Sequence, residues 1–155
     1  MSIVEAGSKA PKFRLEADNG ETLTLASFKG RKLVLYFYPK DDTPGCTKQA
    51  IGFTERLADF EKAGASVLGI SKDTVEKHKK FRDKHNLEVL LASDPEGDVI
   101  ESYGSWVEKN MYGKKYMGIE RSTFLIDEKG IIREVWRKVR VPGHVDKVLE
   151  RVKEL

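Results

Sequence analysis

Two apolar runs, KLVLYFY at residues 32–38 and ASVLGIS at 65–71, constrain the fold of this chain more than any other feature. Their aliphatic, β-branched and aromatic residues predict two strands that are buried on both faces of a sheet. Between the runs, apolar residues recur every three or four positions from about 44 to 62, which indicates an amphipathic helix. A strand, a helix and a second strand form a βαβ unit with a right-handed crossover, so we expect an α/β fold.

Turn and helix signals occupy the rest of the chain. An Asn-Gly turn inside 13–25 and a Lys-Gly turn inside 122–136 each predict a pair of short strands, the first of them a β-hairpin. Residues 104–120 have no clear period, and such a long connection in a compact domain is often functional. The other predicted elements are a helix at 74–86 capped by Asp73 or Thr74, a short strand at 88–94, a short helix at 96–103 and a closing helix at 144–155.

These elements predict one domain over residues 1–155, with a central mixed β-sheet, flanking helices on both faces and an N-terminal β-hairpin. A thioredoxin-like sandwich is one of several α/β folds that fit this order of elements. A chain of 155 residues can bury a sizeable core without disulfides or metals.

The charge of the chain indicates neither a nucleic-acid partner nor a membrane partner. Its 28 basic and 25 acidic side chains leave a net charge of +3, and basic stretches such as KHKK at 77–80 fit solvated helix faces. No apolar run has the length of a transmembrane helix, and the N-terminus lacks the pattern of a secretory signal. One cysteine cannot form an internal disulfide, so we expect a protein of the reducing cytoplasm.

The sequence indicates no cofactor and no metal. The three histidines, His78, His85 and His144, have no metal-ligand spacing. Solvated helix faces account for the first two, and a helix start accounts for His144.

Cys46, the single cysteine, lies at the predicted start of the helix over 44–62. Thr43 suits the N-cap and Pro44 the first helical position, which places Gly45 and Cys46 in the first turn. Unpaired N–H groups and the helix macrodipole favour a thiolate there, and Gly45 leaves room for another molecule near the backbone. Cys46 also lies on the apolar face of its helix, and free cysteine often packs as a small hydrophobe. The pattern therefore leaves a reactive role and an inert role open.

The string FYPKDDTPGCT at 37–47 resembles the peroxidatic motif of peroxiredoxins, with Pro39, Thr43 and Cys46 at the motif spacing. The resemblance is closest to the bacterioferritin comigratory protein or peroxiredoxin Q subfamily, and it covers essentially the whole chain in order. Its other segments are VLGISKDTVEKHKKF at 67–81, LLASD at 90–94 and YGKKYMGIERSTFLID at 112–127. The resemblance implies a thioredoxin-like fold and a thiol-dependent peroxidase of hydrogen peroxide and alkyl hydroperoxides.

The resemblance also implies roles for four residues. Cys46 would be the peroxidatic nucleophile that becomes a sulfenic acid, and Arg121 would stand beside its sulfur. Thr43 would hydrogen-bond the peroxide, while Pro39 would shield the thiolate from water and shape the loop. Fixed donors such as the Cys46 N–H and the Arg121 guanidinium would stabilise charge on the departing oxygen. Each residue also has a plainer structural reading: a buried thiol, a surface cation, a helix cap and a strand terminator.

Two aromatic residues of the 104–120 connection, Trp106 and Tyr112, are further candidates for lining the site. Packing in the core or within the loop explains them equally well.

The chain departs from the subfamily at the resolving cysteine. Many members carry a second cysteine five residues after the first or in the following helix, where this chain has Ile51 and, near the second place, Arg82. A Cys46 sulfenic acid would have no partner thiol in its own chain. We therefore expect a one-cysteine mechanism in which thioredoxin, glutaredoxin or glutathione supplies the second sulfur. A disulfide between the Cys46 residues of two chains is a slower alternative.

Two other functions fit the same fold. A thiol–disulfide oxidoreductase typically uses C-x-x-C, but residue 43 is threonine here. A redox sensor or holdase would oxidise Cys46 with poor turnover. The subfamily is often monomeric, and we expect a monomer or a weak dimer.

Overall fold

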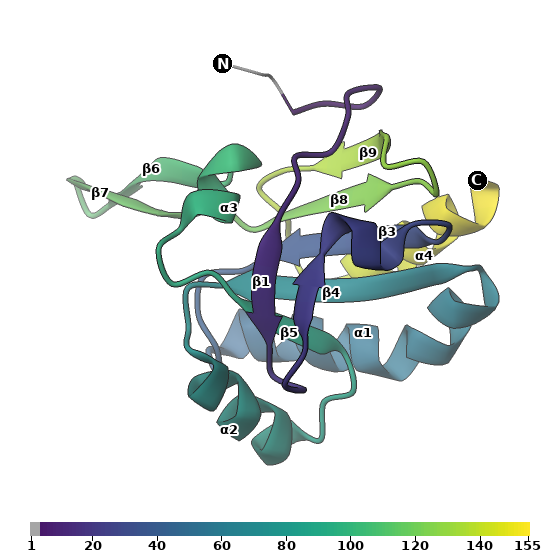
Figure 1. Ribbon diagram of the computed structural model, residues 1–155. Coiled ribbons are helices and arrows are strands. Elements are labelled where there is room, and N and C mark those ends of the chain that lie inside the picture. Colours follow the sequence, from purple (N-terminus) through teal and green to yellow (C-terminus); the bar gives the residue numbers. More distant parts are fainter. Residues whose placement is uncertain (1–3) are drawn as a thin grey trace.

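The computed structural model describes residues 4–155 and contains a seven-stranded sheet with the strand order β2-β1-β5-β4-β3-β8-β9 (Figure 1). Strand β3 is parallel to β4, and β4 to β5, while the remaining pairs of this sheet are antiparallel. Its strands are β1 (Arg14–Ala17), β2 (Thr22–Thr24), β3 (Lys32–Phe37), β4 (Ala65–Ser71), β5 (Leu90–Ser93), β8 (Ser122–Ile126) and β9 (Ile132–Trp136). The helices are α1 (Pro44–Lys62), α2 (Val75–His85), α3 (Asp98–Ser102), α4 (His144–Glu154) and the 3-10 helix η1 (Leu25–Phe28). The mixed sheet that the sequence predicts is therefore confirmed.

Strand β3 is buried on both faces because its side chains alternate between two cores. Val34 and Tyr36 belong to the core under α1, α2 and α4, while Leu35 and Phe37 belong to the core under η1 and α3. Figure 1 shows α1 and α2 together on one side of the sheet. Helices thus cover both faces, as expected from the two-sided apolar run of β3.

The region 104–120, for which no period was found, contains a second sheet. Strands β6 (Trp106–Met111) and β7 (Lys114–Ile119) form an antiparallel hairpin that projects from the main body (Figure 1). Most of its side chains are exposed or half-buried, so no alternation of apolar and polar residues marked the strands. Tyr112 occupies the turn with a left-handed backbone, at φ 54°.

The predicted helix at 96–103 is shorter in the structure, since α3 begins at Asp98 after Gly97 and ends at Ser102. Thr74, one of the two candidate caps of α2, accepts a hydrogen bond from the Lys77 N–H. Among residues 4–155 there is no helix with the combined length and apolar character of a membrane span.

Candidate active site

Cys46 lies in the first turn of α1, at the end of the loop that leaves β3. Thr43 is the N-cap residue with an extended backbone, and Pro44 is the first helical residue, as the sequence predicts. The first backbone hydrogen bond of the helix joins the Thr47 N–H to the Thr43 carbonyl, so the N–H groups before it have no partner inside the helix. The Cys46 side chain points into the protein, and only 2% of the residue is exposed.

Arg121 reaches Cys46 because of the register between two neighbouring strands. Ser122 at the start of β8 pairs with Phe37 at the end of β3, which brings the residue before β8 to the loop after β3. The Arg121 Nη2 donates to the Cys46 Sγ at 3.2 Å, across 75 positions in the sequence. An arginine guanidinium stays protonated in proteins, so this contact stabilises a thiolate and any negative charge that develops beside it.

Gln49 is a site residue that the sequence reasoning missed. It follows Cys46 by three positions, which puts both on one face of α1, and it is fully buried. Its Oε1 accepts from the Arg121 Nη1 at 2.6 Å, so it holds the guanidinium beside Cys46. The available signal was a polar side chain on an otherwise apolar helix face.

Gly45 provides the space that the guanidinium occupies. A Cβ built at this position would lie 3.2 Å from the Arg121 Nη2, closer than nearly all real contacts of that kind. The room that the sequence predicted beside the backbone is therefore taken by the side chain of Arg121.

Thr43 and Pro39 lie on the loop that carries Cys46. The Thr43 Oγ1 donates to the Lys40 carbonyl at 2.9 Å and makes no cap bond to the helix. Its hydrogen is therefore engaged, and its oxygen remains an acceptor for an incoming O–H group. Pro39 is exposed and follows the buried Tyr38, the first residue after β3.

The charges around the sulfur come from several elements. Lys109 of β6 is close enough to be affected: burial and the positive charge of Arg121 lower the pKa of Lys109, while Glu120 and Cys46 raise it. Burial, followed by the charges of Cys46 and Asp41, raises the pKa of Tyr36, so its phenol stays protonated. The hairpin of β6 and β7, for which the sequence showed no period, thus brings Lys109 as a second cation toward the site.

Within residues 4–155, three buried side-chain polar atoms have no hydrogen-bond partner, and two of them belong to residues beside Cys46 or Arg121, while the third lies 3.8 Å from the Arg137 Nη1. They are the Tyr36 hydroxyl, the Gln49 Nε2 and the Glu120 Oε1. Tyr36 shares the packing cluster of Cys46, Gln49 bonds to Arg121 through its other atom, and Glu120 directly precedes Arg121. Buried polar atoms are usually satisfied, so such a concentration is typical of a ligand or reaction site.

The two aromatic candidates of the hairpin, Trp106 and Tyr112, have different surroundings. Trp106 is half-buried, packs against the core under α3 and has the Lys72 Nζ 4.6 Å from its ring centre. Tyr112 is 99% exposed at the tip of the hairpin, so it does not line the site.

The two positions at which relatives were expected to carry a resolving cysteine hold structural side chains. Ile51 is half-buried against the core under α1. The Arg82 guanidinium donates to the Asp18 carboxylate and to the carbonyls of Leu87 and Val89.

The expectation that His78 lies on a solvated helix face is wrong. His78 is fully buried, because its turn of α2 packs toward β5 and the loop after β3, whereas a polar sequence such as KHKKF suggests solvent. His144 begins α4 as expected, but it is also buried. Residues 4–155 contain no group of three or more side chains that could together hold a metal ion.

The chain is similar to known proteins over nearly its whole length. The sequence matches the AhpC/TSA family over residues 6–135. A relative from Coxiella burnetii is 57% identical over 98% of this chain and 100% of its own length, and peroxiredoxin Bcp of Bacillus subtilis is 48% identical over 98% and 97%. The structure of bacterioferritin comigratory protein from Xanthomonas campestris, described for its alkyl peroxide reduction activity, superposes with a TM-score of 0.87. It is 44% identical over 92% of this chain and 90% of that one.

Proposed function

This chain belongs to the AhpC/TSA family, as a homologue of the Bcp and peroxiredoxin Q peroxidases, and we propose that it reduces peroxides by a one-cysteine mechanism. Cys46 becomes a sulfenic acid, and an external thiol completes the cycle. The substrates are hydrogen peroxide and alkyl hydroperoxides, the latter supported by the activity described for the Xanthomonas relative. The observation that carries the proposal is the hydrogen bond of 3.2 Å from the Arg121 Nη2 to the Sγ of Cys46, which is the single cysteine of the sequence.

In the first step, the Cys46 thiolate attacks one oxygen of the peroxide, so a sulfur–oxygen bond forms and the O–O bond breaks. The sulfur loses two electrons to the peroxide, and the departing oxygen takes up a proton to leave as water or an alcohol. Arg121 and the free N–H groups of the first turn stabilise the charge on the departing oxygen. The Thr43 oxygen accepts a hydrogen bond from the peroxide O–H and thereby orients it.

In the second step, the sulfur of an external thiol attacks the sulfenic acid and releases water, which leaves a mixed disulfide on Cys46. A second thiol then attacks that disulfide and frees the Cys46 thiolate. Glutathione, glutaredoxin and thioredoxin all supply this chemistry. Because only 2% of Cys46 is exposed, the first turn of α1 has to move before a thiol can reach the sulfur.

A steady-state assay tests the peroxidase activity. Peroxide consumption with glutathione, with glutaredoxin and with thioredoxin should stop in Cys46→Ser, since serine forms no sulfenic acid. Equal rates for the variant and the parent protein would refute the proposal.

The two alternative functions predict other results, which are measured by protein-disulfide reduction and by the rate of sulfenic acid formation. A thiol–disulfide oxidoreductase would reduce a protein disulfide faster than free thiol does, although Thr43 stands where its second sulfur would be. A redox sensor would form the Cys46 sulfenic acid quickly and show little turnover with any of the three reductants.

A further inference from the structure

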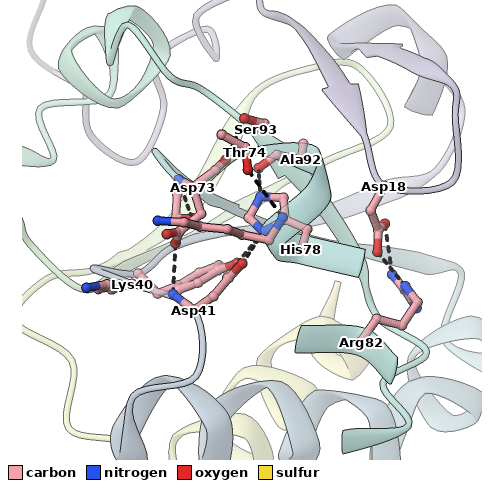
Figure 2. A network of polar contacts seen from close by, with 12 residues as sticks. Asp18, Lys40, Asp41, Asp73, Thr74, His78, Arg82, Ala92 and Ser93 are labelled. Atoms are coloured by element: carbon pink, nitrogen blue, oxygen red, sulfur yellow. Dashed lines mark hydrogen bonds and ion pairs between the residues drawn. The ribbon is translucent and has the colours of Figure 1, made fainter. Parts of the chain in front are cut away.

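The loop that leads to Cys46, residues 38–43, is held from its other side by helix α2. His78 of α2 lies between the loop and the sheet, as Figure 2 shows. Its Nδ1 is 2.6 Å from the Asp41 Oδ2, and its Nε2 is 2.9 Å from the Ala92 carbonyl of β5. The side chains of His78 and Asp41 are almost completely buried, at 0% and 5% exposure.

The hydrogen-bond partners of His78 and Asp41 show where the hydrogens of this pair lie. The Ala92 carbonyl can only accept, so the His78 Nε2 carries a hydrogen. The Asp41 Oδ2 accepts from the Nδ1, while the Asp41 Oδ1 accepts from the Tyr38 hydroxyl at 2.5 Å. The hydrogen between the Nδ1 and the Oδ2 belongs to the imidazole, because the Tyr38 hydroxyl already donates to the Asp41 carboxylate and the pKa of His78 is raised. His78 is then an imidazolium and Asp41 a carboxylate, which makes a buried ion pair with no net charge.

The groups that face the imidazolium agree with this charge state. They are Tyr38 directly after β3, Asp41 in the loop, Asp73 before α2 and the Ala92 carbonyl in β5. Burial lowers the pKa of His78, but the hydrogen bond and charge of Asp41, the carbonyl and the charge of Asp73 together raise it above its ordinary value. Burial and the charge of Asp41 raise the pKa of Tyr38, which keeps its hydrogen.

The backbone of the loop is attached to the same region. The Asp41 N–H donates to the Asp73 Oδ2 at 2.8 Å, and this oxygen also accepts from the Ser71 Oγ at 2.8 Å. The Ser93 Oγ donates to the Asp73 carbonyl at 2.5 Å, which connects the attachment to β5 (Figure 2). Asp41 is thus held by both its side chain and its backbone.

The next loop residue, Asp42, has a left-handed backbone at φ 62°, which is uncommon for a residue other than glycine but is adopted by aspartate more often than by most residues. Two side chains from the end of α2 bond to its carboxylate: the Lys84 Nζ at 2.7 Å and the His85 Nε2 at 2.8 Å. Two successive loop residues are therefore tied to α2 immediately before the N-cap Thr43.

We propose that the ion pair between His78 and Asp41 positions the loop 38–43 so that Thr43 and the first turn of α1 present Cys46 to Arg121 and the peroxide. The path is short, because the Lys40 carbonyl directly before Asp41 is the acceptor that orients the Thr43 hydroxyl. His78 and Asp41 touch neither substrate nor sulfur, so both are positioning residues. The inference rests on the proposed peroxidase function and names the residues that preorganise its first step.

A second ion pair on the same helix, between the half-buried Arg82 and the buried Asp18, provides the matched control. Arg82 lies one turn after His78 and bonds to Asp18 through two nitrogens, its Nη2 at 2.9 Å from the Asp18 Oδ1 (Figure 2). It also donates to the carbonyls of Leu87 and Val89, both at 2.6 Å. This pair connects α2 to the end of β1 and to the segment before β5. Within residues 4–155, no side-chain hydrogen bond or ion pair joins Arg82 or Asp18 to the loop 38–43. Its loss should destabilise the fold without moving Cys46.

The test separates the two chemical steps in single-turnover experiments. We expect Asp41→Asn and His78→Gln to slow the oxidation of Cys46 by hydrogen peroxide about 10- to 100-fold, since a small misplacement of reacting groups has effects of this size. The reaction of the preformed sulfenic acid with glutathione should be as fast as in the parent protein or faster. The control Arg82→Met should lower the melting temperature but keep both rates within about twofold, as expected for sites that do not interact.

Two further measurements exclude a merely structural role. Amide hydrogen exchange in residues 44–50 should accelerate in the Asp41 and His78 variants and stay unchanged in Arg82→Met. The double variant Asp41→Asn with His78→Gln should recover part of the oxidation rate, because each single variant leaves one buried partner without its opposite charge. If Asp41→Asn does not fold, Lys84→Ala combined with His85→Ala loosens the same loop from the surface through Asp42 and should change the two rates in the same directions.

Parental oxidation rates in folded Asp41 and His78 variants would overturn the proposal, and so would an equal loss of rate in Arg82→Met. A parent protein that forms no sulfenic acid at all would instead refute the proposed peroxidase function.

Discussion

The two sides of the loop before α1 differ in whether their buried polar atoms have hydrogen-bond partners. On the side of α2, both nitrogens of His78, both carboxylate oxygens of Asp41 and the Tyr38 hydroxyl have hydrogen-bond partners. On the side of Arg121, the Gln49 Nε2 and the Tyr36 hydroxyl have none within residues 4–155. The first network is complete in itself and can fix a loop, whereas the second leaves donors that a peroxide or its departing oxygen can use.

The two sides also hold buried histidines in different protonation states. Burial lowers the pKa of His78, but Asp41, the Ala92 carbonyl and Asp73 together raise it above its ordinary value. Burial lowers the pKa of His144 to about 4, and the positive charges of Lys147 and Arg121 act in the same direction. His144 is therefore neutral at pH 7 and shares a hydrogen bond with the Thr123 Oγ1 at 2.8 Å. Burial lowers the pKa of both histidines, and the difference between them comes from the carboxylates and the carbonyl around His78 and the cations around His144.

Replacement of Arg121 should give the largest effect. We expect Arg121→Met to lower kcat/KM for hydrogen peroxide about 100- to 1,000-fold, the usual cost of removing a donor to developing negative charge. The free energy of unfolding should change by about 1 kcal/mol or less, because this side chain serves the reaction more than the fold. The control Arg133→Met removes an exposed guanidinium that pairs with Asp127 and should leave kcat/KM unchanged. If Arg121→Met lowered the free energy of unfolding and left kcat/KM unchanged, the Arg121 side of the loop would serve the fold, as the α2 side does, and the comparison would fail.

The pH dependence of stability should differ in sign between the two histidines. For His144, the unfolded chain binds the extra proton between its ordinary pKa of 6.5 and about 4, so stability falls by about 3 kcal/mol as the pH drops through this window. For His78, the contribution is fully present below pH 6.5 and is lost as the pH rises through its raised folded value.

Urea unfolding of His144→Gln and His78→Gln over a pH series measures both contributions. The His144 variant should lose the acid-side slope, and the His78 variant should lose the slope on the alkaline side. Identical slopes in the two variants would contradict the assigned charge states.

Replacement of Gln49, which carries one of the unpaired polar atoms, should have the smallest effect on the reaction. Gln49→Met removes the acceptor that holds the Arg121 Nη1 and also the unpaired Nε2. We expect kcat/KM to fall about tenfold, since the guanidinium is less well oriented. The free energy of unfolding should stay the same or rise slightly, because a buried amide without a full set of partners is costly. The exposed neighbour Lys48 provides the control as Lys48→Met, and a parental rate in Gln49→Met would exclude a role for Gln49 in catalysis.

The sequence predicted the elements whose burial follows a period. The run at β3, the amphipathic α1 and the cap at Thr43 were all visible, because one or two buried faces leave a regular pattern. The hairpin of β6 and β7 left none, since solvent reaches most of both its faces. Arg121 was identified through the family resemblance alone, because a single arginine among 28 basic side chains has no local signal.

The network around His78 could not be predicted for a different reason. Its partner Asp41 lies 37 positions away, and each residue by itself resembles an ordinary surface side chain. Burial of such a pair depends on the crossover that lays α2 against the loop, which only the three-dimensional fold specifies. Gln49 was missed likewise, because its partner Arg121 is 72 positions distant.

Mass spectrometry of the intact and digested protein after one equivalent of hydrogen peroxide tests the central claim most directly. Without added thiol, the account predicts one additional oxygen on Cys46. With glutathione, it predicts a mixed disulfide at Cys46 that excess thiol returns to the free cysteine. Oxygen on the exposed Met111 or Met117 with an unmodified Cys46, or a Cys46 disulfide between two chains as the main product despite glutathione, would contradict it.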